Sequence, residues 1–464
     1  MTALINFISL QSVETGGAII SPHPLQPVAA GGALVSPRLP IGSPGCIKQD
    51  WVKEKGRAHE VFSRRRMKLG KMFAEGVGSR AEVRSFLRDK QVRLSASLRA
   101  LGGNPTREEA YALRDQSDPW ADVVPHVKWY PKRKANGGFR PVCVLPLQLK
   151  SVHYMIGAVV EAHLPCNSSI YGVSGASRDD AAHALKTLQN SGFCYLAAAD
   201  IKNCFQGINP DAIYQLPLPK EVIRKTLDVR NMTFTTGTEF GVHSEPNGFG
   251  HSREYIDVRN PSGPQGLLQG SPASNIILAW LLRSIPNDDN VAVLLCFDNI
   301  AVAGRTAEVT RQMMDTLADF FRRFPAGPLE LHDYQYTNGE NDLLEFLGYS
   351  FDPQNAGPAI AATSLDKMED VLQKAEAADL SQRPLLPTEL MHALRSRRNG
   401  FAAAVEGNLD MSRLVDSARD AAAWRNHQWS DWLLKAVFEP NNTIEGSIVR
   451  AVLRDNPPCI RKKE

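Results

Sequence analysis

"LLCFDNIAVAG", residues 294–304, consists of two short apolar runs separated by the polar pair Asp298 and Asn299. Asp and Asn are common in tight turns because their side chains bond to nearby backbone groups. The pattern therefore predicts a β-hairpin with a carboxylate at its tip. Turn formation alone would explain the pair, so any chemical role depends on the rest of the chain.

The chain has 464 residues, 43% of them hydrophobic, and a net charge of +3. This length and composition predict two or three globular domains. The charge is unevenly distributed, because residues 48–99 contain 15 Lys or Arg against 6 Asp or Glu. Such an excess favours a polyanionic partner, although a solvated helical face would have the same composition.

The seven cysteines form no CxxC pair, and several lie inside apolar runs. Free cysteines in such runs behave as small hydrophobic residues. A chain whose cysteines suggest no disulfide framework is typical of a reducing cytoplasm. No apolar stretch approaches the roughly 20 residues that a membrane helix needs, and the start lacks the basic leader of a signal peptide. We expect a cytoplasmic protein that does not bind a membrane.

Composition divides the chain into four segments. Residues 1–46 are rich in Gly and Pro and predict a tail or arm, and residues 47–118 predict a basic helical extension. Residues 119–357 mix short β-branched runs with helices, with breaks at Gly, Pro and Asn clusters. Residues 358–464 are helical again.

A second carboxylate lies in "YLAAADIKNCFQGIN", residues 195–209, where Asp200 comes near the end of a small-residue strand. A carboxylate there must be paired, used as a cap or bound to metal, and a cap is the commonest role. If this strand neighbours the first hairpin, Asp200 and Asp298 face one cleft. Paired carboxylates are what Mg²⁺ requires in a two-metal phosphoryl-transfer site, with the ions about 4 Å apart.

A tight loop precedes a helix in "GLLQGSPASNIILAWLL", residues 266–282. Ser271 is a suitable cap, and Pro272 suits the first helical position. Gln269 would then project just before a helix N-terminus, a place that suits a phosphate or a nucleotide edge. A plain helix start is the alternative.

Basic side chains flank a predicted turn in "WYPKRKANGGFRPVCV", residues 129–144. Lys132 to Lys134 precede the turn and Arg140 follows it, so they could clamp a triphosphate or simply protect an edge strand. Further on, "LLEFLGYSF", residues 343–351, predicts a strand in which Gly348 allows close backbone approach.

In this order, the motifs over roughly residues 125–355 resemble those of bacterial reverse transcriptases. The matching stretches are "GGFRPV", "YGVSGASRDDAAHAL", "AADIKNCF", "QGSPAS", "FDNI" and "FLGYSF". The resemblance implies an α+β fold, a right-hand polymerase with fingers, a palm of antiparallel sheet and helices, and a helical thumb over 358–464. In "YGVSGASRDDAAHAL", Ser177 and Asp180 also predict a capping box.

The resemblance also implies which residues form the site. Two Mg²⁺ ions, with Mn²⁺ as the alternative, would be held by catalytic Asp200 and Asp298 together with the Ile201 carbonyl. Phe205 would lie under the sugar and exclude a 2′-hydroxyl, which implies dNTPs. The remaining nucleotide-binding positions would be Lys132, Arg140, Gln269 and Gly270, and the primer grip would comprise Leu347, Gly348 and Tyr349.

The sequence departs from the family pattern at two places. The second carboxylate of the hairpin motif is Asn299, which implies a supporting role beside the metal or a loss of activity. The stretch 331–342 lacks the Lys that commonly protonates the leaving pyrophosphate. His332 is a candidate substitute because its ordinary pKa suits proton donation, and a surface-loop histidine is the alternative.

The resemblance implies an RNA-directed DNA polymerase that adds dNTPs to a 3′-hydroxyl. The architecture resembles that of retron and defence-associated bacterial enzymes, which implies a role in an anti-phage system with a dedicated non-coding RNA or a partner protein. A homo-oligomer of this chain is the alternative to a partner protein. The expected partners are an RNA template, a DNA product and dNTPs. The alternatives are a degenerate polymerase fold that only binds RNA or a partner, and an RNA-dependent RNA polymerase.

Overall fold

The computed structural model describes residues 44–133, 139–164, 169–173, 175–236, 264–288, 290–339 and 342–364. The chain divides into two compact units, Met1–Glu54 and Lys55–Glu464. In the first unit, the described residues are the opening turns of helix α1 (Pro44–Ala74). The predicted tail and thumb fall outside the described residues, apart from 44–46 and 358–364.

Within residues 44–125, which the structure describes, four helices precede the first described strand: α1, α2 (Arg80–Arg88), α3 (Lys90–Leu101) and α4 (Arg107–Gln116). Asp89 separates α2 from α3, because its side chain accepts hydrogen bonds from the backbone N–H groups of Gln91 and Val92. At α4, Thr106 and Glu109 form a reciprocal capping box. Local caps therefore set the boundaries of these helices.

Helix α5 (Leu147–Ala162) has ten buried residues, which lie around much of its circumference. It packs against α3 and α4, and against the later helices α8 (Lys220–Thr226) and α9 (Ser274–Leu281). A helix that is apolar on many sides is stable only inside a core. The short helix α7 (Cys204–Gly207) and two 3₁₀ turns, Pro210–Gln215 and Val229–Asn231, connect this region to the sheets.

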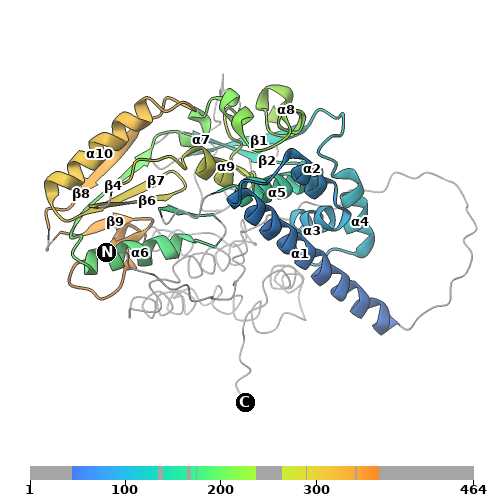
Figure 1. Cartoon of the computed structure of the whole chain (residues 1–464), viewed down its shortest axis with the longest axis horizontal. Helices are drawn as coiled ribbons and strands as arrows, with labels where there is room; N and C mark the ends of the chain where they lie inside the picture. The colour runs from blue at the N-terminus through green and yellow to red at the C-terminus, as the bar shows by residue number, and fades with distance from the viewer. Residues whose placement is uncertain are drawn as a thin grey trace, which may run out of the picture. The chain divides into compact units, whose positions relative to one another are not determined.

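A five-stranded sheet carries the candidate site, in the order β3–β6–β7–β4–β8 (Figure 1). Its strands are β3 (Ile170–Tyr171), β4 (Tyr195–Ile201), β6 (Val291–Cys296), β7 (Asn299–Gly304) and β8 (Leu331–Tyr336). All neighbours are antiparallel except β3 and β6. Helix α10 (Ala307–Arg322) packs on β4, β6 and β7, and α6 (Arg178–Asn190) on β3, β6 and β7. The expected mixed α+β architecture is confirmed.

Two three-stranded sheets complete the described β-structure. One has the order β2–β1–β5, formed by β1 (His126–Arg133), β2 (Phe139–Val144) and β5 (Thr233–Thr236). The other has the order β11–β10–β9, formed by β9 (Leu344–Phe346), β10 (Tyr349–Phe351) and β11 (Ala359–Ile360).

The prediction of one strand over 343–351 was wrong, because the stretch is a hairpin of β9 and β10. Leu347 and Gly348 connect the two strands with φ angles of 56° and 80°. Two successive residues with positive φ make the tight turn that matches the twist of a hairpin. Gly348 therefore serves the turn.

One large hydrophobic core joins the sheet to α1, α2, α5, α9 and α10. A second, smaller cluster lies under β1 and β2 and includes Val127, Trp129, Cys143 and Leu268. The predicted capping box at α6 is confirmed, since Ser177 and Asp180 bond reciprocally. Among the described helices, none is long and apolar enough to cross a bilayer.

Candidate metal centre

Asp200 lies at the centre of a polar row that crosses three strands. In the β4–β7 ladder it stands opposite Asn299, and in the β4–β8 ladder it stands opposite His332. Directly opposed residues of antiparallel strands project to the same face of the sheet. Asp200 and the hairpin therefore lie on neighbouring strands, which is the condition for the two carboxylates to face one cleft.

The β6–β7 turn consists of Phe297 and Asp298, between the last residue of β6 and the first of β7. Phe297 has a φ of 58°, a conformation that costs energy for a bulky residue. Its ring lies against Gly172, where a Cβ atom would come within 2.6 Å of the ring. Gly172 itself has a φ of 79°, so the absence of a side chain there makes room for the turn.

Two hydrogen bonds hold Asp298 beside Asp200. The Ile201 backbone N–H donates to the Asp298 carbonyl oxygen at 2.8 Å, which attaches the turn to the end of β4. The Asn299 side-chain amide donates to Asp298 Oδ1 at 3.1 Å and so orients the carboxylate. Asn299 therefore orients the neighbouring carboxylate of Asp298.

On the other side of β4, strand β8 contains a bulge. Ala198 pairs with Gln335 and Asp200 with His332, so two β8 residues face the single residue Ala199. The extra residue is Asp333, whose φ is 55°. Asp tolerates this left-handed conformation better than most residues, and bulges redirect side chains next to functional sites.

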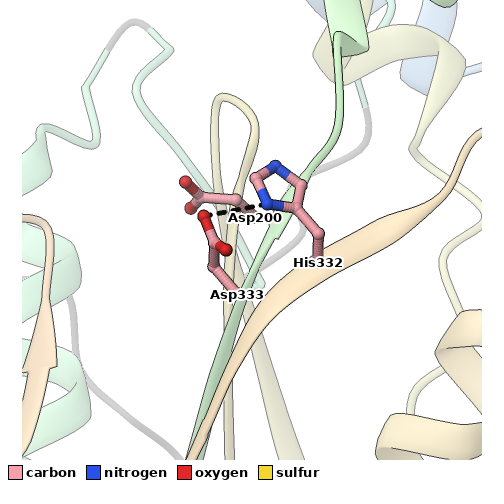
Figure 2. A group of neighbouring side chains, drawn as sticks. All are labelled: Asp200, His332 and Asp333. Atoms are coloured by element: carbon pink, nitrogen blue, oxygen red, sulfur yellow. Dashed lines mark ion pairs between the residues drawn. The ribbon is translucent and has the colours of Figure 1, made fainter. Parts of the chain in front are cut away.

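The bulge brings His332 and Asp333 to Asp200 (Figure 2). One potential ligand atom from each of the three side chains lies within 4.8 Å of the other two. His332 Nδ1 and Asp333 Oδ2 form an ion pair at 2.8 Å, with side-chain exposures of 32% and 75%. The sequence singled out His332 as a proton donor but missed Asp333, because the bulge depends on pairing with β4.

Electrostatics at Asp200 favour a cation. Burial is the largest influence and raises the pKa of Asp200, and the negative charges of Asp298 and Asp333 raise it further. His332 and Arg140 oppose this rise. A half-buried carboxylate beside two others is stabilised in its charged form when a positive ion lies among them.

The predicted basic hairpin is near the site through Arg140, which is exposed on β2 and close enough to lower the pKa of Asp200. Arg140 stands opposite Lys132 in the β1–β2 ladder, so both project to one face of this hairpin. Residues 134–138 of the predicted turn lie outside the described residues.

The loop with Gln269 and Gly270 is attached to β2. The Cys143 N–H donates to the Gln269 carbonyl oxygen at 2.7 Å, and a Cβ atom at Gly270 would come within 2.3 Å of the Cys143 oxygen. Gly270 has a φ of 108°, which a residue with a side chain rarely adopts. Gln269 Oε1 is buried without a hydrogen-bond partner among the described residues.

The same loop also bonds to the residue predicted to lie under the sugar. The Leu267 N–H donates to the Phe205 carbonyl oxygen at 2.8 Å, and the Phe205 side chain packs partly buried against the main core. The helix that follows begins at Ser274, two residues later than Pro272. The delay arises because Ser271 Oγ accepts a bond from the Ala273 N–H inside the preceding turn.

A buried histidine that the sequence did not single out supports this loop. His153 on α5 is 1% exposed, and its ring nitrogens lie 2.6 Å from the Thr226 carbonyl oxygen and 2.7 Å from Ser271 Oγ. A carbonyl only accepts, so Nε2 donates to Thr226 and Nδ1 accepts from the Ser271 hydroxyl. Burial lowers the pKa of His153 to about 4, which keeps it neutral.

The predicted primer-grip residues lie in the β9–β10 hairpin, which packs through β9 on β4, the strand of Asp200. Tyr349 is fully buried, and its hydroxyl donates to Asp179 Oδ1 on α6 at 2.5 Å. The Arg178 guanidinium lies over the Tyr349 ring at 5.4 Å from its centroid. Leu347 and Gly348 form the turn of the β9–β10 hairpin, so this element is attached to α6.

Comparison with protein families produced no matching model, and comparison with curated proteins produced no match either. Among solved structures, the apo telomerase from Candida tropicalis is similar at 12% identity and a TM-score of 0.37, covering 70% of this chain and 63% of that chain. Telomerase from Candida albicans in complex with a TWJ fragment of telomeric RNA is similar at 11% identity and a TM-score of 0.34, covering 72% and 65%.

A Candida tropicalis telomerase truncated from its C-terminal domain is similar at 13% identity and a TM-score of 0.35, covering 52% of this chain and 56% of that chain. The chain thus spans between about half and two thirds of these telomerase chains. Likeness at this level leaves the function to be argued from the site residues of this chain.

Proposed function

We propose that the chain is a nucleic-acid polymerase of the reverse-transcriptase type, which adds dNTPs to a 3′-hydroxyl on an RNA template. The observation that carries this proposal is the attachment of Asp298 to the end of β4, beside Asp200. A carboxylate near the end of β4 and a second one in the adjacent β6–β7 turn are the donor set that two-metal phosphoryl transfer needs. Helices on the sheet fit a palm, and the β1–β2 hairpin fits fingers.

The donor set fits a hard divalent cation. Asp200, Asp298 and the Ile201 carbonyl offer oxygen ligands, which Mg²⁺ prefers and Mn²⁺ also accepts. Bound there, such ions would neutralise charge on the transferring phosphoryl group and favour ionisation of the attacking hydroxyl. Asn299 holds the Asp298 carboxylate in place through its side-chain amide.

The surrounding residues would bind and orient the nucleotide. Arg140, with Lys132 on the same face of the hairpin, would hold the triphosphate through charge-assisted hydrogen bonds. Phe205 would lie under the sugar and exclude a 2′-hydroxyl. Gln269 and Gly270 would line the incoming base pair from a loop whose backbone is bonded to β2 and to Phe205.

Helix α1 supports an RNA partner. Arg57, Arg64 and Lys68 are exposed, and their spacing of seven and four residues places them along one face. Other cations of α1 are already paired, as Arg65 is with Asp89 and Arg66 with Glu161. Lys71 is likewise paired with Glu75. A line of exposed cations that have no acidic partner among the described residues favours a phosphate backbone.

We further propose a role in a bacterial anti-phage defence or retron-like system, in the cytoplasm, with a dedicated RNA or protein partner. This proposal rests on the architecture implied by the sequence resemblance. A thumb for the product duplex would be formed by residues 358–464.

The direct test is incorporation of labelled dNTPs or NTPs by the purified chain on a primed RNA template with Mg²⁺. We expect incorporation of dNTPs, and its loss in Asp298→Ala. Asp122→Asn is a suitable control because the Asp122 side chain is 99% exposed and lies outside the cluster. RNA that co-purifies with the chain should be sequenced and added back as template.

A second candidate function is favoured by Asn299, the neutral residue where the family pattern has an acid. In that case the chain binds RNA or a partner without catalysis. Absence of incorporation with either nucleotide set, in the presence of co-purified RNA, would favour this binding role. Preference for NTPs that persists when Phe205 is made small would favour an RNA polymerase instead.

A further inference from the structure

The two flanks of Asp200 differ in the groups they offer to a cation. On the β7 side stands the Asn299 amide, which is used to orient Asp298. On the β8 side stand His332 and Asp333. The β6–β7 hairpin offers the amide of Asn299 next to Asp200. Strand β8, the other neighbour of β4, offers a carboxylate and an imidazole.

We propose that His332 and Asp333 are metal ligands and that this site binds a divalent first-row transition cation, such as Mn²⁺, in preference to Mg²⁺. The proposal deepens the proposed function and rests on it for the role of Asp200 as a metal ligand. Strand β8 would then supply an imidazole as well as a carboxylate, whereas a pair of aspartates supplies carboxylates alone.

The distances carry the first part of this inference. One atom from each of Asp200, His332 and Asp333 lies within 4.8 Å of the others, without any rearrangement of the strands. His332 is placed by its ladder position opposite Asp200, and Asp333 by the bulge. The strand register and the bulge thus each direct one donor of β8 toward Asp200.

The chemistry of the donors carries the second part. A cluster of carboxylates alone suits Mg²⁺, Ca²⁺ or Mn²⁺ and selects among them only by cavity size and number of ligands. An imidazole nitrogen binds first-row transition ions more strongly than it binds Mg²⁺. Replacing one oxygen donor by His332 therefore shifts the preference of the site toward ions such as Mn²⁺.

The site is reachable from solvent. The side chains of His332 and Asp333 are 32% and 75% exposed, so an ion can reach both without displacing core residues. In the described structure the two side chains form an ion pair with each other. The alternative to metal binding is that this surface ion pair is their whole role, and the experiment must separate the two.

The experiment measures binding of Mn²⁺ and of Mg²⁺ to the full chain by titration calorimetry, and ¹⁴N couplings of bound Mn²⁺ by pulsed electron paramagnetic resonance. We expect the wild-type chain to bind Mn²⁺ at least about tenfold more tightly than Mg²⁺ and to show an imidazole ¹⁴N coupling. His332→Gln should lose that coupling and about tenfold in Mn²⁺ affinity, with little change for Mg²⁺.

Two further variants complete the test. Asp333→Asn should weaken binding of both ions, whereas His183→Gln, which changes an exposed histidine on α6, should change neither. Circular dichroism of each variant checks that the fold is retained. Equal affinities for the two ions, or a ¹⁴N coupling that persists in His332→Gln, would overturn the proposal and leave the surface ion pair as the explanation.

These outcomes are distinguishable from failure of the proposed function. A chain that shows the His332 coupling but incorporates no nucleotide has the metal site without polymerase activity. A chain that incorporates dNTPs but shows no ¹⁴N coupling is a polymerase whose metal site excludes His332. Binding and incorporation should therefore be measured on the same preparations.

Discussion

The β6–β7 turn and the β8 bulge bring side chains to Asp200 from opposite sides, and each uses one residue with positive φ. In the turn that residue is Phe297, whose ring is packed against Gly172. In the bulge it is Asp333, whose side chain is 75% exposed. A residue with positive φ therefore lies in a packed flank at the β6–β7 turn and in an open flank at the β8 bulge.

The difference has a physical cause. A strained bulky residue persists only where its surroundings determine its position, as they do at Phe297. Asp adopts the left-handed region more readily, so Asp333 needs less support. We infer that Asp298 is held rigidly by neighbouring atoms, whereas His332 and Asp333 can move to accommodate what binds.

The largest effect is expected at Asp200, which both flanks share. Asp200→Asn should reduce dNTP incorporation by roughly a thousandfold or more, because it removes the charge at the centre of the row. Single-turnover primer extension measures this, with Asp122→Asn as the control. If the variant keeps more than a tenth of the activity, the site lies elsewhere.

A second packed part of the molecule is the loop containing Gln269, which His153 supports through Ser271. His153→Ala should lower the free energy of unfolding by about 3 kcal/mol, because it leaves a cavity and two buried polar atoms without their partner. Urea unfolding of the full chain measures this. An unchanged midpoint would show that the loop is held by its backbone bonds alone.

The same residue predicts a pH dependence of stability. The pKa of His153 is lowered from 6.5 to about 4 in the folded chain, so the unfolded chain binds more protons between these values. The free energy of unfolding should therefore fall as the pH drops from about 6.5 to about 4, by up to about 3 kcal/mol. His153→Ala should lack this component, which a pH series of urea titrations would test.

Two nearby glycines test how tightly the Phe297 ring is packed at the β6–β7 turn. Gly172 and Gly175 have φ angles of 79° and 85°, but only at Gly172 would a Cβ atom meet the Phe297 ring. Gly175→Ala should cost about 1 kcal/mol from backbone strain, and Gly172→Ala about 2 kcal/mol or more, because overlap adds to strain. Thermal unfolding compares them, and equal costs would mean that the ring moves freely.

The smallest effect is expected at the bulge. Asp333→Val should cost about 1 kcal/mol, because a β-branched residue fits the left-handed region poorly, whereas Asp333→Gly should be close to neutral. Urea unfolding measures both variants. If valine costs as much there as alanine costs at Gly172, the β8 flank is as rigid as the turn.

Local sequence was sufficient for the turn and for β4. Asp298 is predictable because a two-residue hairpin is encoded in adjacent residues, and Asp200 because a run of small apolar residues ends there. The proximity of Arg140 to Asp200 is consistent with the prediction for the basic hairpin. The assignment of residues 343–351 failed because two short strands joined by Leu347 and Gly348 resemble one longer strand.

The residues that the sequence analysis did not predict, Asp333 and His153, are placed by contacts between segments far apart in the chain. Nothing in residues 331–336 marks Asp333 as an extra residue, because a bulge exists only relative to the partner strand. His153 resembles an ordinary core residue until α8 and the Gln269 loop are placed against it. Long-range register, which the sequence does not display, decides both cases.

The bulge has an evolutionary consequence. Because β8 is one residue longer than β4 at this point, strand length places Asp333 beside Asp200. Deletion of Asp333 would restore regular alternation, with His332 still opposite Asp200 and Gln335 still opposite Ala198, and would remove this carboxylate from the site. Insertion or deletion of a single residue, without any substitution, is thus the smallest genetic step that creates or removes this flank of the site.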